Sequence, residues 1–193
     1  MRNFRKSLLV AGLVAVSLTL AACAPSSSSP DAGSSSAASA FNDQDVSFVQ
    51  GMLPHHEQAV EMADIILAKD GIDPQVLNLA QTIKDEQQPE IETMTGWLAE
   101  WDAPTSMGGM DHGSGTMGGM MSDDDMANLD GATAKTASEL FLTQMTAHHM
   151  GAIEMAQTEI DAGESSAAID LATSIVSTQQ AEIDEMKRIL STL

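Results

Sequence analysis

An internal repeat constrains the fold of this chain more than any other feature of its sequence. Residues 48–63, FVQGMLPHHEQAVEMA, align with residues 141–156, FLTQMTAHHMGAIEMA, at an offset of 93, and eight of the sixteen positions are identical. Residues 79–98 align with residues 171–190 at an offset of 92, with nine identities in twenty positions. The chain therefore carries two copies of one unit, and each unit contains two blocks.

Each block has the hydrophobic periodicity of an α-helix. In the first block, apolar residues and His55 recur at spacings of three and four residues from Phe48 to Ile66. This spacing places them on one face of a helix. His56, one residue further along, is expected at the edge of that face. The same stripe recurs in the third block around His148, so we expect His55 and His148 to face inward near each other and His149 to lie at the stripe edge.

Local start and stop signals predict where four helices begin and end. Asp73 before Pro74 is a typical N-cap followed by proline at the first helical position. Gly163 is expected to end a helix, and Thr136 with Glu139 forms a capping-box sequence. We therefore expect helices over residues 43–69, 74–101, 136–162 and 166–191.

These helices predict an all-α fold, a four-helix bundle built from two repeated helical hairpins. Connections of a few residues make the two helices of each unit antiparallel neighbours. Hairpin one would cover residues 43–101 and hairpin two residues 136–192, within a bundle domain of residues 42–193. A Met/Gly-rich linker, residues 102–135, would join them as an unstructured connector.

The N-terminus predicts export. Three basic residues among the first six precede an apolar stretch from Leu8 to Leu20. This pattern is typical of a signal peptide and is too short for a membrane span. LAAC, which ends at Cys23, resembles a bacterial lipobox, so we expect residues 1–22 to be removed and Cys23 to be lipidated. A lipid anchor would hold the protein at the cell membrane, facing the periplasm or the outside.

Composition narrows the classes of partner. Residues 23–41 are rich in Ser and Ala and predict a flexible tether. With 8 Lys and Arg against 28 Asp and Glu, the net charge is −20, which excludes a nucleic-acid partner. The single Cys excludes an intramolecular disulfide and a CxxC zinc site.

Methionine is the outlier of the composition. The chain has 14 methionines, and five of them fall within MGGMDHGSGTMGGMM at residues 107–121. Apolar side chains on a Gly-rich segment gain little from a core, whereas thioether and imidazole groups suit Cu(I). The linker therefore holds secondary candidate ligands: Met107, Met110, His112, Met117, Met120 and Met121.

The paired histidines of the repeat predict a principal metal site. A buried methionine usually only fills a core, and a single histidine on an apolar face is usually structural. Here both residue types recur together at equivalent positions of two copies, which favours a soft-metal site. The candidate ligands are Met52, His55, His56 and Met62 in the first copy, and Met145, His148, His149 and Met155 in the second.

The sequences MLPHHEQAVEMA and MTAHHMGAIEMA resemble a bacterial secreted family known as domain of unknown function 305. The resemblance covers about residues 43–192. It implies a ferritin-like four-helix bundle, periplasmic copper binding and copper tolerance in some members, and no established enzymatic activity. The candidate ligands that it carries over are His55, His56, Met62, His148, His149 and Met155.

Two alternatives to copper remain open. A ferritin-like di-iron protein would need Glu-x-x-His motifs. His55 and His148 instead follow Met52 and Met145 at that spacing, although Glu90 and Glu182 keep iron open. A metal-free surface interaction module with structural histidines is the other alternative, and its stability would not respond to metal.

The sequence favours a binding protein over an enzyme. It contains no nucleophile elbow, phosphate-binding loop or zinc-protease motif, so we expect no catalysis. The favoured function is binding of Cu(I) or Ag(I) outside the cytoplasm, for buffering, sequestration or hand-off. A copper chaperone or exporter would be the partner in a hand-off.

Overall fold

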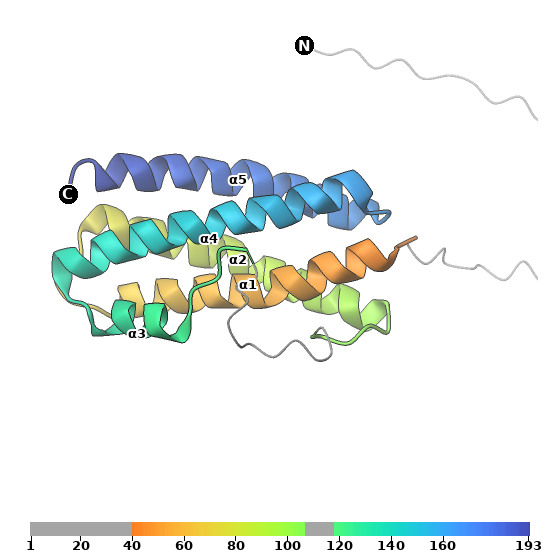
Figure 1. The fold of residues 1–193 in the computed structure, drawn as a ribbon, viewed down its shortest axis with the longest axis horizontal. Coiled ribbons are helices and arrows are strands. Elements are labelled where there is room, and N and C mark those ends of the chain that lie inside the picture. Colours follow the sequence, from red (N-terminus) through yellow and green to blue (C-terminus); the bar gives the residue numbers. More distant parts are fainter. Residues whose placement is uncertain (1–39, 107–117) are drawn as a thin grey trace, which may run out of the picture. The chain divides into compact units, whose positions relative to one another are not determined.

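The computed structural model describes residues 40–106 and 118–193, which form five α-helices and contain no strand (Figure 1). The helices are α1 (Asp43–Leu67), α2 (Pro74–Glu100), α3 (Asp123–Gly131), α4 (Ala134–Ala162) and α5 (Ser166–Leu190). The predicted all-α class is confirmed for these residues. The four long helices begin and end within two residues of the predicted positions.

The long helices pack in sequence-adjacent pairs. Helix α1 lies along α2 and α4 lies along α5, and the two pairs meet mainly through α1 and α4 (Figure 1). Helices α2 and α5 contact each other at only a few residues. The buried apolar residues form two clusters, and a groove remains between α2 and α5.

The N-caps show which local predictions were right. The Asp73 side chain accepts a hydrogen bond from the Gln75 amide at 2.8 Å, with Pro74 at the first position of α2, as predicted. Ser165 caps α5 by accepting a bond from Ala168. The capping box predicted at Thr136 was wrong, because α4 already begins at Ala134.

Helix α3 lies within the linker and was not predicted. Ser122 and Asp125 form a capping box at its start, and three Asp residues in its first turn favour the helix dipole. Leu129 is fully buried and anchors the helix against the core. The prediction of an unstructured connector was therefore wrong for residues 123–131.

A buried carboxylate ties the start of α1 to the turn between α4 and α5. Asp45 accepts hydrogen bonds from the amides of Ser165 at 2.9 Å and Glu164 at 3.2 Å. Burial alone would raise the pKa of Asp45, but its hydrogen bonds, first that with Glu159, lower it. Burial, and then Asp45 itself, raise the pKa of fully buried Glu159 to about 8.

Several predictions concern residues outside the described ranges. These are the signal peptide, the Cys23 lipidation site, most of the tether, and the linker candidates Met107, Met110, His112 and Met117. None of the helices in the described part of the chain is long and apolar enough to cross a membrane.

Candidate metal centre

The four repeated histidines gather inside the protein, where α1 meets α4. His55 and His56 of α1 and His149 of α4 are fully buried, and His148 of α4 is 1% exposed. The rings of His55 and His148 lie against each other, with centroids 3.7 Å apart. The structure therefore brings together the histidines of the two copies, which are 93 residues apart in the sequence.

Two carboxylates from the outer helices hold the second histidine of each pair. Nε2 of His56 lies 2.7 Å from Glu90 of α2, and Nε2 of His149 lies 2.7 Å from Glu182 of α5. A carboxylate can only accept a hydrogen bond, so we assign the ring proton of His56 and of His149 to Nε2. Nδ1 of each ring then carries a free lone pair. Both Nδ1 atoms are buried without a hydrogen-bond partner.

These carboxylates account for the complete burial of His56 and His149. A buried imidazole needs a polar partner, and Glu90 and Glu182 supply one from the neighbouring helix. Carboxylate–histidine pairs of this kind orient ligating histidines in metal sites. The sequence contained a signal for them, since both Glu residues are identities of the repeat.

The first histidines of the two pairs have different partners. Nε2 of His55 lies 3.1 Å from the carbonyl oxygen of Gly118, and its Nδ1 has no partner. Neither ring nitrogen of His148 has a hydrogen-bond partner among residues 40–106 and 118–193. His148 is thus the one histidine of the cluster that no neighbouring group orients by a ring-nitrogen hydrogen bond.

Burial keeps these central imidazoles neutral. Desolvation lowers the pKa of His55 to about 3; the Gly118 hydrogen bond opposes the change, and the neighbouring His56 and His149 reinforce it. Desolvation, followed by the charges of the other histidines, also holds the pKa of His148 well below 6.5, and a contact with the His55 backbone, too poorly aligned to count as a hydrogen bond, opposes the change. A neutral imidazole is the form that binds a metal ion.

The predicted methionine ligands are all placed in or against the core. Met62 and Met145 are fully buried in one apolar cluster, together with Met186. Met52 is fully buried in a second cluster, against which partly buried Met155 packs. Packing alone accounts for this burial.

Of the linker candidates, only Met120 and Met121 are described. Both are half-buried, and Met121 packs against the core. The side chain of Gln58 on α1 holds the Met121 backbone twice, donating to its carbonyl at 2.9 Å and accepting from its amide at 2.7 Å. The part of the linker just before α3 is therefore bonded directly to α1, the helix that carries His55 and His56.

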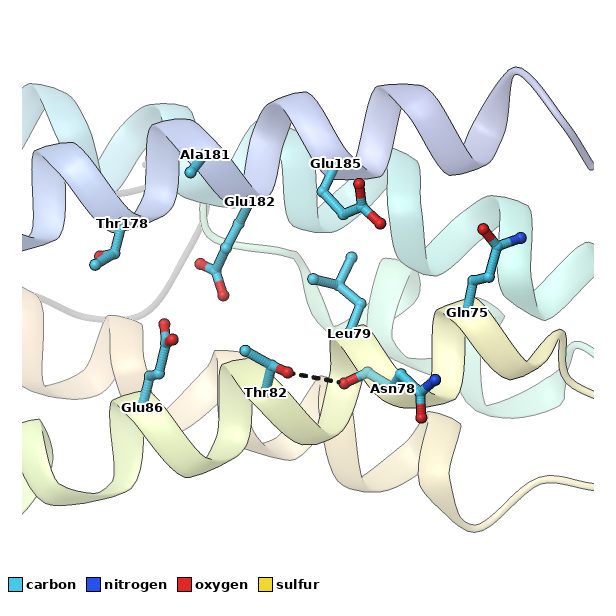
Figure 2. Close-up of a pocket in the computed structure, with 9 residues that line it drawn as sticks. All are labelled: Gln75, Asn78, Leu79, Thr82, Glu86, Thr178, Ala181, Glu182 and Glu185. Carbon is cyan, nitrogen blue, oxygen red and sulfur yellow. Dashed lines mark hydrogen bonds between the residues drawn. The ribbon is translucent and has the colours of Figure 1, made fainter.

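An acidic groove opens between α2 and α5 (Figure 2). It has a volume of about 450 Å³, and Glu86, Glu182 and Glu185 line it. The carboxylates of Glu86 and Glu182 extend into this space from opposite helices. Burial, then the charges of Glu182 and Glu90, raise the pKa of Glu86. Glu182 therefore both lines the groove and bonds His149 of the cluster.

The donor set fits a soft ion better than a carboxylate-bound one. Within residues 40–106 and 118–193, no three His, Cys, Asp or Glu side chains converge to hold a metal ion, so imidazoles alone do not complete a site and thioether sulfur would have to contribute. The carboxylates nearest the cluster, Glu90 and Glu182, are occupied by imidazole N–H groups. The cluster provides imidazole nitrogens without hydrogen-bond partners among the described residues, and a methionine-rich core surrounds them.

The fold and this centre define an all-helical protein with a buried, carboxylate-supported histidine cluster. The chain belongs to the DUF305 family, "domain of unknown function", whose model matches residues 45–190. A search of the curated proteins found no match.

Solved structures of related proteins have the same fold. A DUF305 fragment from Deinococcus radiodurans is 33% identical over 79% of this chain and 98% of that chain, with a TM-score of 0.72. A Streptomyces coelicolor DUF305 protein, described as a predicted secreted protein, is 32% identical over 77% and 91%, with a TM-score of 0.71. CopM in its Cu(II)-bound form is 32% identical over 77% and 96%, with a TM-score of 0.66. CopM is also known in Cu(I)- and Ag-bound forms.

Proposed function

We propose that this protein binds copper as Cu(I), and Ag(I) as a second soft ion, at the buried histidine cluster. The observation that carries the proposal is the set of buried ring nitrogens without partners: Nδ1 of His55, His56 and His149, and both nitrogens of His148. A buried polar atom left unsatisfied costs about 1–3 kcal/mol. A metal ion shared by one imidazole of each copy would satisfy two such atoms.

The surroundings favour a soft ion. Imidazole and thioether are ligands that suit Cu(I), and Met52, Met62 and Met145 are buried on the helices that carry the histidines. The structures of CopM with Cu(I), Cu(II) and Ag support the same choice of ion for this chain. We do not propose the di-iron alternative, because Glu90 and Glu182 are bonded to imidazoles, and the Glu-x-x-His spacing before His55 and His148 is filled by methionine.

We infer that the α1–α2 and α4–α5 pairs are two copies of one hairpin in a ferritin-like four-helix bundle. The His–Glu distance is 2.7 Å in both pairs. The N-caps Asp73 and Ser165 also occupy equivalent positions at the offset of 92. Both observations support a duplicated unit that places one half of the metal site in each copy.

We propose a role in buffering, sequestration or hand-off rather than catalysis. The lipobox that ends at Cys23 supports anchoring at the cell membrane, and the predicted secretion of the Streptomyces coelicolor relative supports export. A copper chaperone or exporter would exchange ions with the protein. Linker methionines would add binding capacity of lower affinity, because ordering a Gly-rich segment costs about 1–2 kcal/mol per residue fixed.

An anaerobic Cu(I) titration against a competing chelator tests the proposal on the soluble protein that begins at Ala24. Two variants separate the helices from the linker. In one, His55, His56, His148 and His149 are changed to Leu. In the other, Met107, Met110, Met117, Met120 and Met121 are changed to Leu. The histidine variant should lose the tightest ion, and the linker variant should lose capacity but keep that ion. Tight binding that survives in the histidine variant would refute the proposal.

A further inference from the structure

Residues 118–121, here called the strap, lie across α1 and α4 at the histidine cluster. The carbonyl of Gly118 accepts the hydrogen bond of His55 Nε2, and the backbone of Met121 is paired with the side chain of Gln58. One end of the strap is therefore fixed to an imidazole of the cluster. The other end is fixed to α1, three residues beyond that imidazole.

The backbone of the strap packs directly against the backbone of α4, and this contact is called the seat. A Cβ atom at Gly151 of α4 would overlap the carbonyl of Gly118. Gly119 has a φ of +85°, which L side chains rarely adopt, and a Cβ atom there would lie 2.5 Å from the carbonyl oxygen of Ala147. The seat therefore requires glycine on both sides of the contact.

The two copies of the repeat contribute to the seat in different ways. Gln58 and Gly151 are equivalent residues at the offset of 93. In the first copy this position supplies a side chain that grips the strap. In the second copy it supplies no side chain and so leaves room for the strap. The two equivalent residues therefore both help to hold the strap across α1 and α4, although by different means.

We propose that the strap is the cover of the His55–His148 pair, and that it leaves its seat when an ion enters or leaves. The strap contacts the ring of His55 through Gly118 and the backbone of His148 through Gly119. The strap is four residues long and is held by one hydrogen bond to an imidazole and by the side chain of Gln58. Such a small unit opens more easily than the helices beneath it. Opening removes the one hydrogen-bond partner that the His55 ring has among the described residues. This inference rests on the proposed function only for the identity of the ion.

Gly151→Ala unseats the strap and tests the proposal. Gly96→Ala is the matched control, because Gly96 is also helical and a Cβ atom there meets nothing within 4 Å. Gln58→Leu provides a second test, since it removes the clamp from a half-buried side chain and leaves the core unchanged. Circular dichroism verifies that each variant keeps its helices.

The first measurement needs no metal. Diethylpyrocarbonate modification of His55 and His148, followed by mass spectrometry, should be about tenfold faster in Gly151→Ala and Gln58→Leu than in the wild type. Gly96→Ala should react at the wild-type rate. Equal modification rates in all four proteins would refute the proposal that the strap covers these two histidines. If Gly151→Ala fails to fold, the rate of Gln58→Leu decides the result.

The second measurement uses Cu(I) alone. Transfer of bound Cu(I) to a chelator should be about tenfold faster in the two strap variants than in Gly96→Ala. Unchanged transfer rates together with faster modification would overturn the role in ion exchange. A wild-type protein that binds no Cu(I) would refute the proposed function, and the modification experiment would still test the cover.

Discussion

The two copies of the repeat agree at the outer shell of the histidine cluster and differ at its centre. His56 and His149 each bond a carboxylate of the neighbouring helix at 2.7 Å. His55 bonds the Gly118 carbonyl, whereas His148, its equivalent, has no partner at either ring nitrogen. The two copies therefore make the same hydrogen bond at His56 and His149, the bond that orients a ligand. They differ at His55 and His148, where only the His55 ring bonds the strap.

The same contrast appears at the ends of the helices. At the offset of 93, Glu159 of α4 corresponds to Ile66 of α1, and both are fully buried. Asp45, which pairs with Glu159, corresponds to buried Ser138. One end of the α1–α4 contact is therefore joined by an acid pair, and the other end contains Ile66 and Ser138. The repeat defines a symmetric centre, and the differences between the copies add a cover on one side and an acid pair at one end.

The largest expected effect comes from removing the central imidazoles one at a time. His55→Leu and His148→Leu should each lower Cu(I) affinity by about 100-fold or more, since even an outer-shell change costs about 10–100-fold. His148→Leu should also stabilise the metal-free protein by about 1–2 kcal/mol, because it removes two unsatisfied buried nitrogens. His55→Leu should not, because it leaves the Gly118 carbonyl unpaired.

Chelator competition and urea denaturation measure these two quantities. The shared centre would be disproved if only one of the two variants lost affinity for copper. Equal unfolding free energies for the two variants would contradict the difference in their hydrogen bonding.

The next effect concerns the equal outer shell. Glu90→Gln and Glu182→Gln keep the shape of the side chain but remove the charge that holds Nε2. Each should lower Cu(I) affinity by about tenfold, and by similar factors, because the two hydrogen bonds have the same length. Competition with a chelator measures both. A loss in only one variant would show that the copies do not contribute equally.

A smaller effect tests the acid pair with pH. The pKa of Glu159 is 4.5 when unperturbed and about 8 in the folded protein. Its contribution to stability is full below pH 4.5 and is lost as the pH rises through about 8, because the unfolded chain releases this proton first. Glu159→Gln should therefore be more stable than the wild type by about 1–2 kcal/mol at pH 9.

Urea denaturation between pH 5 and 9 provides the measurement for this prediction, and Glu154→Gln, on the exposed face of the same helix, is the control. The wild type and Glu154→Gln should lose stability along this range, whereas Glu159→Gln should lose less. Parallel pH curves for all three proteins would argue against a protonated Glu159.

The smallest effect compares the equivalent N-caps. Asp73→Ala and Ser165→Ala should each lower the free energy of unfolding by about 1 kcal/mol. The change at Ser165 should be the smaller of the two, because its hydrogen bond is longer, at 3.3 Å against 2.8 Å. Denaturant titrations resolve this difference. A larger loss at Ser165 would show that the cap also supports the Asp45 contact.

Periodicity predicted the helices because their stripes are long and repeated. It missed α3, whose nine residues contain a single buried side chain, Leu129. The pairing of His55 with His148 followed from the repeat, since equivalent residues of two copies face a shared core. The supporting carboxylates were harder to assign, because Glu90 and Glu182 are conspicuous only as identities of the second block.

The strap could not have been predicted from local sequence. Gly118 and Gly119 lie in a Gly-rich segment, and such composition normally indicates flexibility. Their role in the seat depends on Gly151, which is more than thirty residues further along the chain. Close contact between backbones is a tertiary property, and a single sequence contains no periodic signal for it.

The Asp45 contact has a kinetic consequence. Asp45 bonds amides that lie 119 and 120 residues further along the chain. Joining segments so distant costs more loop-closure entropy than forming a local helical hairpin. We expect the contact to form after the hairpins, so that its loss accelerates unfolding and leaves the folding rate almost unchanged. Asp45 thereby sets the lifetime of the native state rather than the speed at which the chain reaches it.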